Sequence, residues 1–336
     1  MTGVPSPPDP ARLDGPACAV IFTTDETYLF PTLLAAVQAR QHASRDKADI
    51  LICHFGLDPR TEALFGPICA GEGICLLLVR ADTIEQVSPM MARLFLDRFI
   101  PPQYTQFLYM DGDVQVGRSL DPLITATVEP GQFLAVNDPM TFLLGDPDRL
   151  SRGLAGHLAS IGLSPGEAHR YFNTGVLRIN RRGWNAIGEH AWALTREGAH
   201  TFRFPDQDPL NIAGRSVHAP LSLAWNFPVF MRNAGLHTVI DPCITHFMSS
   251  PKPWHGTFRP WNSRACQPYS SLIARFPGLA PFRQRLTVGR QVHYRLLQTY
   301  KYIEESSSWR RAVRRTRVMD YERNAALSNL FPGDQG

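Results

Sequence analysis

The chain has 336 residues, of which 44% are hydrophobic and 19% charged, and its formal net charge is +4. This composition is typical of a soluble globular protein, and no apolar run approaches the roughly 20 residues that a membrane-spanning helix needs. The length suits one large α/β domain with an extension, or two domains. The six cysteines are scattered without a CxxC spacing, which predicts free thiols in a reducing cytosol rather than a disulfide framework or a zinc site.

The first 16 residues, MTGVPSPPDPARLDGP, are rich in proline. They lack the basic-then-apolar order of a signal peptide. We therefore expect a flexible tail at residues 1–16 and a cytoplasmic protein.

From residue 17 onward, short apolar runs alternate with stretches of helical spacing. The runs predicted to be strands are residues 17–25, 48–56, 73–81 and 106–114, and the stretches predicted to be helices are residues 30–43 and 89–100. This alternation predicts a parallel, doubly wound α/β sheet, in which ligands bind at the carboxyl ends of the strands. The first strand–helix junction, TTDETYLFP, has no glycine for a tight pyrophosphate turn, which argues against a dinucleotide-binding Rossmann site.

The alternation is less regular after residue 116. The expected elements are a strand at 131–138, a turn, strand and helix start at 171–184, a helix N-terminus at 204–213, and a short strand at 237–247 that runs up to His246. Asp206 is the predicted N-cap of the helix at 204–213. Beyond about residue 261 the sheet pattern ends and helices are expected.

The stretch FLYMDGDVQV, residues 107–116, leads an apolar strand into two aspartates separated by one glycine. Carboxylates this close repel each other unless a cation, a shared proton or water offsets their charge. Asp111 and Asp113 suit a hard divalent cation, and Gly112 lets the backbone bend and approach a ligand closely. Mn²⁺ also accepts imidazole, so a distant histidine could complete the set. A solvated Asp-Gly-Asp turn is the structural alternative.

A second chemistry fits the same pair of aspartates. Haloacid dehalogenase-type phosphatases place a nucleophilic aspartate and an acid/base aspartate at this spacing after an apolar strand. They normally carry Thr or Val two residues after the second aspartate, where this chain has Gln115, and their motif usually opens the domain. The phosphatase is therefore the less favoured hypothesis.

Several separate stretches, in matching order and spacing, resemble glycosyltransferase family 8, the retaining sugar-nucleotide transferases that include bacterial lipopolysaccharide galactosyl- and glucosyltransferases. The resemblance runs from about Ala19 to Trp254 and rests on VIFTTDETYL, MARLFL, FLYMDGDV, YFNTGVLRIN, PDQDPLN and HFMSSPKPWH. It implies the GT-A fold, a single Rossmann-like α/β domain with a mixed, mostly parallel sheet and flanking helices. We expect this catalytic domain at residues 17–260 and a basic, helical C-terminal extension at residues 261–336.

The resemblance also implies a metal site and a donor site. Asp111, Asp113 and His246 would hold Mn²⁺, with Mg²⁺ as the alternative. Asp25 would read the uracil edge of a UDP-sugar, and Lys252 would pair with its diphosphate. The full set expected to bind the donor is Thr23, Asp25, Arg93, Asp111, Gly112, Asn173 and Lys252.

Three further residues are implied at the reacting face. Asp138 would accept hydrogen bonds from the sugar hydroxyls, Asp206 would bind donor or acceptor hydroxyls, and Gln207 would lie nearest the anomeric carbon. An amide is a poor nucleophile and cannot act as a base at neutral pH, so front-face transfer with retention is favoured over a covalent intermediate. The structural alternatives are an Asp-Pro turn for Asp138, a helix cap for Asp25 or Asp206, and a surface helix charge for Arg93.

The basic residues are concentrated toward the C-terminal end. Residues 283–323 contain eleven Lys or Arg against four Asp or Glu, a charge of +7, which leaves −3 for the remainder. Aromatic residues are interleaved with these arginines, and such a helix can lie on an anionic membrane surface. A solvated or packed helix is the alternative, and no motif supports nucleic-acid binding. We expect truncation near Gly289 to leave hydrolysis of the donor intact.

Two classes of function therefore remain. One is a metal-dependent, retaining transferase that moves a hexose from a UDP-sugar to a glycan or lipid-linked acceptor of a surface polysaccharide or lipopolysaccharide. The other is a non-catalytic sugar-nucleotide-binding module that kept the fold. The complete set of Asp111, Asp113, His246 and Lys252 favours the transferase.

Overall fold

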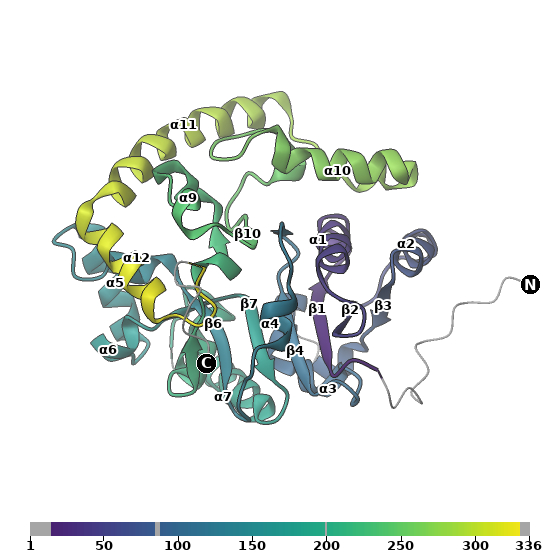
Figure 1. The fold of residues 1–336 in the computed structure, drawn as a ribbon, viewed down its shortest axis with the longest axis horizontal. Helices are drawn as coiled ribbons and strands as arrows, with labels where there is room; N and C mark the ends of the chain where they lie inside the picture. The colour runs from purple at the N-terminus through teal and green to yellow at the C-terminus, as the bar shows by residue number, and fades with distance from the viewer. Residues whose placement is uncertain (1–14, 85–87, 199, 330–336) are drawn as a thin grey trace, which may run out of the picture.

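The computed structural model describes residues 15–84, 88–198 and 200–329, and the tail expected at residues 1–16 lies almost entirely outside them. A seven-stranded sheet in the order β3-β2-β1-β4-β7-β6-β8 forms the centre of the molecule (Figure 1). Its strands are β1 (Cys18–Thr24), β2 (Ala48–His54), β3 (Ile74–Leu78), β4 (Gln106–Met110), β6 (Phe133–Asn137), β7 (Phe172–Asn180) and β8 (His218–Pro220).

Neighbouring strands of this sheet are parallel except at β7, which is antiparallel to β4 and to β6. The predicted mixed, mostly parallel sheet is confirmed. Because β1, β2 and β4 are parallel, their carboxyl ends meet at one edge, where open α/β sheets bind ligands. A second sheet of three short strands, in the order β5 (Val114–Val116), β10 (Ile244–His246) and β9 (Phe227–Pro228), begins directly after the Asp-Gly-Asp turn that ends β4.

Helices cover both faces of the large sheet (Figure 1). The α-helices are α1 (Leu29–His42), α2 (Pro59–Gly71), α3 (Leu96–Phe99), α4 (Asp121–Thr125), α5 (Arg149–Ser160), α6 (Pro165–Ala168), α7 (Trp184–Glu197), α8 (Gln207–Gly214), α9 (His237–Ile240), α10 (Ser263–Arg275), α11 (Val288–Arg310) and α12 (Ala312–Asn324). The 3₁₀ turns are η1 (Ala81–Ile84), η2 (Pro89–Phe95), η3 (Pro139–Leu143), η4 (Leu223–Trp225), η5 (Val229–Ala234), η6 (Pro253–His255) and η7 (Pro277–Phe282).

The two faces of the sheet bury two separate hydrophobic cores. Along β1, Val20 and Phe22 belong to the core that includes α1, whereas Ala19 and Ile21 belong to the core that includes η2 and α7. Successive side chains of a strand point to opposite faces, so a strand covered on both sides needs an apolar residue at every position. This is why β1 has a continuous apolar run.

The helix predicted at residues 89–100 is instead the 3₁₀ turn η2 followed by the single helical turn α3. Trp184 of α7 donates its indole N–H to the carbonyl of Arg93 at 3.0 Å. An α-helix would use that carbonyl within its own ladder. In the 3₁₀ turn η2, the carbonyl of Arg93 is therefore bonded to Trp184 of α7 and not to a residue of its own helix.

The last helix packs directly on the central sheet. Glu322 of α12 is fully buried and accepts from the Ser222 hydroxyl and from Leu223 N, both at 2.7 Å. The hydroxyl of Tyr321 donates to the carbonyl of Leu221 at 2.6 Å and accepts from Asn137 N at 2.9 Å. Helix α12 therefore holds β6 and η4, so cutting the chain near residue 289 would remove contacts that the central sheet uses. The expectation that such a truncation is harmless conflicts with these contacts.

Within the described residues, no helix combines the length and the apolar character that crossing a membrane requires.

Candidate active site

Three residues that are far apart in the sequence meet at the carboxyl end of β4. Asp111 follows β4 directly, Asp113 precedes β5, and His246 is the last residue of β10. Strand β10 pairs antiparallel with β5 so that His246 lies opposite Val114, and Phe247 N donates to the carbonyl of Asp113 at 3.1 Å. The register of this small sheet therefore fixes the imidazole beside the two aspartates.

The ligand atoms of these residues converge. Nε2 of His246 lies 3.1 Å from Oδ1 of Asp113 and 3.9 Å from Oδ2 of Asp111. The three ligand atoms lie within 4.8 Å of one another, and no other group of three or more His, Cys, Asp or Glu side chains in the described ranges does the same. Two carboxylate oxygens and an imidazole nitrogen suit a divalent cation such as Mn²⁺ or Mg²⁺. The structure therefore has a potential metal site.

The second oxygen of each aspartate is held by a buried cation. Arg93 donates from Nη2 to Oδ1 of Asp111 at 2.8 Å, and Lys252 donates from Nζ to Oδ2 of Asp113 at 2.5 Å. Tyr109 also donates its hydroxyl proton to Oδ1 of Asp111, at 3.0 Å. Each carboxylate is thus anchored through one oxygen and presents the other toward the imidazole.

Lys252 and Asp113 form a buried ion pair. Burial by itself would raise the pKa of Asp113, but the ammonium of Lys252 and the contact with His246 outweigh it and hold that pKa well below its ordinary value. Burial would likewise lower the pKa of Lys252, and the carboxylate of Asp113 raises it instead. The pair is therefore charged at neutral pH, although only 6% of Lys252 is exposed.

Gly112 allows a close approach between the aspartate turn and α1. A Cβ atom on Gly112 would lie 2.1 Å from Oγ1 and 3.2 Å from Cβ of Thr32. A side chain at this position would displace the turn, and both carboxylates with it. The need for glycine therefore comes from packing against α1, in addition to the expected approach to a ligand.

A second group of polar side chains joins β6, β7 and α8. Asn173 donates from Nδ2 to Oδ2 of Asp138 at 3.2 Å and to Oε1 of Gln207 at 3.0 Å. Gln207 donates from Nε2 to the same oxygen of Asp138 at 3.1 Å, and its Oε1 accepts from Thr174 N at 3.3 Å. Burial raises the pKa of Asp138, although these hydrogen bonds and one from Met140 N oppose the shift. Asp138, Asn173 and Gln207 therefore form one network.

Asp206 and Arg93 connect this network to the potential metal site. Asp206 stands at the predicted N-cap position of α8, but its side chain makes no capping hydrogen bond. Its Oδ2 accepts from the Thr174 hydroxyl at 3.0 Å and lies 3.3 Å from Nη1 of Arg93. Arg93 is buried, with its guanidinium 4.8 Å from the centre of the Tyr109 ring, which excludes the alternative of a surface helix charge. A single guanidinium thus lies between Asp111 and Asp206.

Asp208, the other acidic residue of the PDQD stretch, is fully buried. It accepts from the Tyr171 hydroxyl at 2.6 Å and from the backbone N–H groups of Arg203 and Phe204 at 2.8 and 3.1 Å. Nε2 of His157 lies 3.2 Å from its second oxygen. Asp208 therefore holds the chain that leads into α8.

The end of β1 carries the two residues expected to bind uracil. Asp25 is exposed, and its Oδ1 accepts from Tyr28 N at 2.9 Å just before α1. This hydrogen bond is the kind of contact expected if Asp25 served as a helix cap. It uses Oδ1 and does not involve Oδ2. The hydroxyls of Thr23 and Tyr109 lie 3.1 Å apart, which connects β1 to the Asp111 carboxylate through Tyr109.

Sequence reasoning missed three residues of the site: Tyr109, Thr174 and Asn226. Tyr109 and Thr174 fall inside quoted motifs, FLYMDGDV and YFNTGVLRIN, and their hydroxyl groups next to expected site residues were the available signal. Asn226 lies in the short stretch AWNFP, which carries no recognisable pattern. It is fully buried and contacts both Asn173 and His246.

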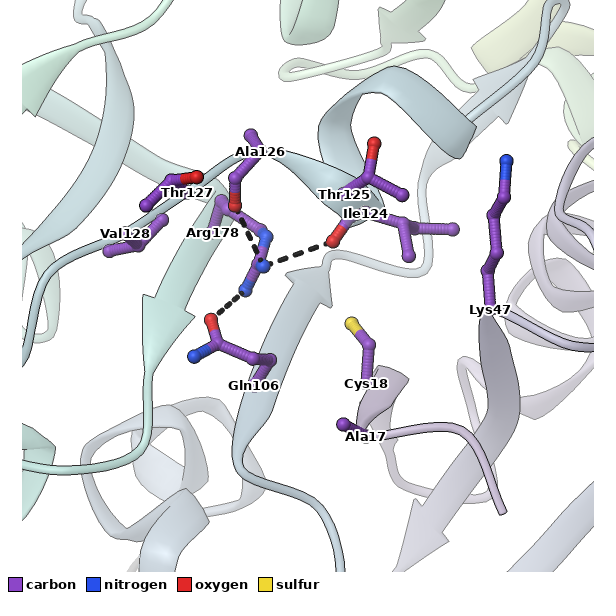
Figure 2. Close-up of a pocket in the computed structure, with 10 residues that line it drawn as sticks. All are labelled: Ala17, Cys18, Lys47, Gln106, Ile124, Thr125, Ala126, Thr127, Val128 and Arg178. Atoms are coloured by element: carbon purple, nitrogen blue, oxygen red, sulfur yellow. Dashed lines mark hydrogen bonds between the residues drawn. The ribbon is translucent and has the colours of Figure 1, made fainter. Parts of the chain in front are cut away.

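A separate pocket lies at the opposite, amino-terminal ends of β1 and β4 (Figure 2). Its volume is about 330 Å³, and Arg178, Lys47 and Cys18 are among the side chains that line it. Arg178 donates to the carbonyls of Leu123, Ile124 and Ala126 at 2.9–3.0 Å and to Gln106 Oε1 at 2.7 Å, so its donors serve to hold the C-terminal end of α4. This pocket shares no residue with the potential metal site.

Comparison with known proteins supplies the family. The model of glycosyl transferase family 8 matches residues 78–257, which include both aspartates of the turn, the PDQD stretch and His246. No curated protein sequence matches the chain.

Solved structures supply the fold. The galactosyltransferase LgtC, in complex with donor and acceptor sugar analogs, is 22% identical, with a TM-score of 0.60 over 75% of this chain and 95% of LgtC. The bifunctional glycosyltransferase WbbM is 18% identical, with a TM-score of 0.62 over 81% of this chain and 52% of WbbM. The glycosyltransferase GlyE of Streptococcus pneumoniae TIGR4 is 19% identical, with a TM-score of 0.54 over 77% of this chain and 63% of GlyE. At these identities the likeness establishes the GT-A fold alone.

The family match spans more than half of the chain, and the mixed seven-stranded sheet agrees with the fold of LgtC. These findings replace the hypotheses of a phosphatase and of a non-catalytic module. The chain belongs to glycosyltransferase family 8 and is a glycosyltransferase with the GT-A fold.

Proposed function

We propose that this enzyme transfers a hexose from a UDP-sugar, with the help of a divalent cation, to a glycan or lipid-linked acceptor of a surface polysaccharide or lipopolysaccharide. One observation carries the proposal. Asp111 and Asp113 are each anchored through one oxygen by a buried cation, and their other oxygens converge with Nε2 of His246. Arg93 and Lys252 each hold one oxygen of an aspartate, and the other oxygen of each aspartate faces the imidazole. This arrangement suits a bound cation better than a solvated turn.

The donor set favours Mn²⁺, with Mg²⁺ as the alternative, because Mn²⁺ accepts imidazole together with carboxylates. When bound, the cation would neutralise negative charge on the diphosphate of the departing UDP. Asp111, Asp113 and His246 would hold it. Gly112 keeps the turn that carries both carboxylates against α1.

Lys252 is expected to bind the donor diphosphate. Its ammonium group now donates to Asp113 and to the carbonyl of Phe247. A lysine carries a compact charge on a flexible four-carbon stem, so a small rotation can turn it from Asp113 to a phosphate oxygen. The exchange replaces one anionic partner by another, and Lys252 stays paired throughout.

The uridine is expected at the end of β1. Asp25 would accept from the uracil edge with the oxygen that Tyr28 N does not use. Thr23 would contribute the neighbouring backbone. Both residues stand at the carboxyl end of β1, where ligands bind in sheets of this type.

The transferred sugar is expected over the network of Asp138, Asn173 and Gln207. Asp138 would accept from the sugar hydroxyls, as would Asp206 from donor or acceptor hydroxyls. Gln207 is fixed by bonds to Asn173 and Thr174 and would direct its carbonyl dipole at positive charge on the anomeric carbon. Arg93, whose donors are occupied by protein groups, would support the two carboxylates and reach the donor sugar only by giving up one of these bonds.

Transfer is proposed to occur on one face of the sugar. The bond from the anomeric carbon to the UDP oxygen breaks while the acceptor oxygen forms its bond from the same side. The acceptor proton passes to the departing UDP oxygen, so no protein base is required. This path keeps the anomeric configuration, in agreement with the retaining character of the family.

We further propose that the enzyme contacts an anionic membrane surface through α11. Five of its apolar side chains are 50–78% exposed and recur every three or four residues along one face: Val288, Val292, Leu296, Tyr300 and Ile303. Exposed arginines, Arg290, Arg295 and Arg310, accompany them. A face with this combination of apolar and basic residues suits the boundary between lipid headgroups and acyl chains.

The structure changes which arginines this contact can use. Arg314 is only 2% exposed and forms ion pairs with Asp146 at 2.6 Å and Asp148 at 2.9 Å. Arg317 pairs with Asp146 at 2.8 Å. These two arginines hold α12 against the chain before α5, so the proposed membrane contact rests on α11.

The test of the proposed function is release of UDP from a panel of UDP-sugars in the absence of acceptor. We expect release with Mn²⁺, loss of release in EDTA, and recovery when Mn²⁺ is added back. The matched variant is Asp111→Asn, which keeps the size of the side chain and should abolish release. Full activity in EDTA would reject the metal assignment and restore the solvated turn.

A further inference from the structure

The imidazole of His246 ends a chain of hydrogen bonds that begins at a backbone amide. Gly175 N donates to Oδ1 of Asn173 at 3.0 Å. Asn226 donates from Nδ2 to the same oxygen at 2.8 Å, and Oδ1 of Asn226 lies 2.8 Å from Nδ1 of His246. Nε2 of His246 faces the two aspartates.

The direction of every bond in this chain follows from its ends. A backbone N–H can only donate, so the atom of Asn173 that faces Gly175 is its oxygen. Nδ2 of Asn173, on the other side of the amide, donates to the carboxylate of Asp138, which is consistent with the same orientation. Because Oδ1 of Asn173 can only accept, the Asn226 atom that faces it must be the donor Nδ2. The other amide atom of Asn226, Oδ1, therefore faces His246. Nδ1 of His246 must therefore carry a proton.

The same residues leave the imidazole little freedom to turn. Asn226 is 0% exposed and His246 is 4% exposed. A Cβ atom on Gly175 would lie 2.3 Å from Cε1 and 2.7 Å from Nδ1 of His246, so the ring packs directly on the glycine backbone. A 180° flip of the ring would exchange Nδ1 with Cδ2 and so put a C–H against the oxygen of Asn226.

We propose that Asn226 is a positioning residue that keeps the proton of His246 on Nδ1 and so reserves the Nε2 lone pair for the cation. The inference rests on the proposed metal site, but the tautomer exists in the metal-free protein and can be measured there. Groups that orient a ligating histidine typically change metal affinity by about 10–100-fold when they are removed. The same hydrogen-bonded chain reaches Asp138, so it physically connects the ligand histidine to the network expected beneath the donor sugar.

The experiment reads the tautomer and the metal affinity separately. Long-range ¹H–¹⁵N correlation spectra of the metal-free, full-length protein, recorded at a series of pH values, report which ring nitrogen carries a proton; His246→Gln identifies the signals. We expect the Nδ1–H form in the wild type. Asn226→Leu should populate the Nε2–H form and weaken Mn²⁺ binding by about 10–100-fold, measured by the electron paramagnetic resonance signal of free Mn²⁺.

Two variants separate positioning from a general loss of structure. Asn226→Asp keeps an oxygen that accepts from Nδ1, so the Nδ1–H form should persist. Asn233→Leu is the matched control, because Asn233 is also buried but donates to Glu305 of α11, away from the aspartate turn. It should lower the melting temperature and leave the tautomer and the Mn²⁺ affinity unchanged.

The Nε2–H form in metal-free wild type would overturn the inference, as would Asn226→Leu with an unchanged tautomer and unchanged Mn²⁺ affinity. If Asn226→Leu does not fold, the wild type and Asn226→Asp still decide the tautomer. A wild type that binds no Mn²⁺ but holds His246 as Nδ1–H would contradict the proposed metal function and support the positioning role of Asn226.

Discussion

Arg93 and Asp111 are joined by an ion pair of 2.8 Å that leaves a single oxygen of the aspartate facing the imidazole of His246. Arg93 reaches Asp111 from the 3₁₀ turn η2 and touches Asp206 with its second nitrogen. Two acidic residues of the site are therefore oriented by one buried guanidinium, and a change at Arg93 should disturb both of them.

The first prediction is that Arg93→Lys weakens metal binding. Lysine cannot span Asp111 and Asp206 with two nitrogens, so Asp111 should lose its fixed orientation. We expect Mn²⁺ affinity to fall by about 10–100-fold, measured by titration without donor. Arg181→Lys is the control, because Arg181 also donates to carbonyls and lies over an aromatic ring, Phe107, but does not touch the aspartates. Unchanged Mn²⁺ affinity with a raised KM for the donor would instead assign Arg93 to the donor sugar.

The second prediction concerns the glycine beneath the imidazole. Gly175→Ala would place a methyl group 2.3 Å from Cε1 of His246, and the ring must move away from the aspartates. Binding of Mn²⁺ should weaken at least about tenfold, with a loss of UDP release to match. Gly156→Ala in α5, where a Cβ atom meets nothing within 4 Å, should instead stabilise the helix by about 1 kcal/mol and leave metal binding unchanged. Equal metal affinity in both variants would show that packing on Gly175 does not hold the imidazole in place.

The third prediction is that Gln207→Ala slows transfer without changing its stereochemistry. Gln207 is proposed to stabilise positive charge and not to form a covalent bond, so its loss should reduce the rate by about 10²-fold. The coupling constant of the anomeric proton in the product measures the outcome. An α-linked donor should still give an α-linked product. A β-linked product, or complete loss of turnover, would contradict the proposed single-face path.

The fourth prediction concerns the membrane surface. Leu296→Asp and Ile303→Asp each place a negative charge in the apolar face of α11, and both should reduce co-flotation with phosphatidylglycerol-containing vesicles while UDP release stays normal. Leu150→Asp is the control, because Leu150 is 58% exposed on a different helix, α5. Binding should also weaken with salt, since exposed charges are screened within about 10 Å at 0.1 M. Equal flotation of all three variants with the wild type would reject the α11 contact.

The fifth prediction is a pH dependence set by Glu322. Burial raises the pKa of Glu322, although hydrogen bonds from Ser222, Leu223 N and Ser328 oppose the shift. Because the folded pKa lies above the unfolded value of about 4.3, its contribution to stability is fully present below about pH 4.3 and is lost as the pH rises through the folded pKa.

The variant Glu322→Gln does not titrate and should lack this contribution. The difference in free energy of unfolding, wild type minus variant, should therefore fall as the pH rises from about 4 toward neutrality. Urea unfolding at a series of pH values measures the difference. A difference that grows with pH would show that Glu322 is stabilised as the carboxylate, contrary to the prediction.

Much of the fold could be predicted from the sequence because its signals are local. The strand β1 and the helix α1 follow from apolar periodicity, and Asp111 and Asp113 follow from a strand that ends in acidic residues. The family resemblance brought in His246, which periodicity alone could not have connected to a turn more than a hundred residues earlier.

The parts that could not be predicted depend on tertiary contacts. Asn226 has no sequence signal, because its role depends on the orientation of an amide in Asn173 and not on any local pattern. Asp206 has the sequence context of an N-cap, yet Thr174 and Arg93 offer its carboxylate stronger partners. Helix α12 looked like a separable basic tail because its arginines are visible in the sequence, whereas the burial of Glu322 is not.

The contacts of α12 also determine when the fold can be completed during synthesis of the chain. Ser222 and its partner Glu322 are separated by 100 residues, and the backbone bridge between Leu221 and Ala326 closes a similar span. At 5–20 residues per second, a ribosome needs about 5–20 s to make that intervening chain. During this interval the edge of the sheet at β8 has no covering helix, and an uncovered edge is a template for pairing with another chain. The nascent enzyme is therefore expected to be vulnerable to misassociation, and to benefit from a chaperone, until α12 emerges.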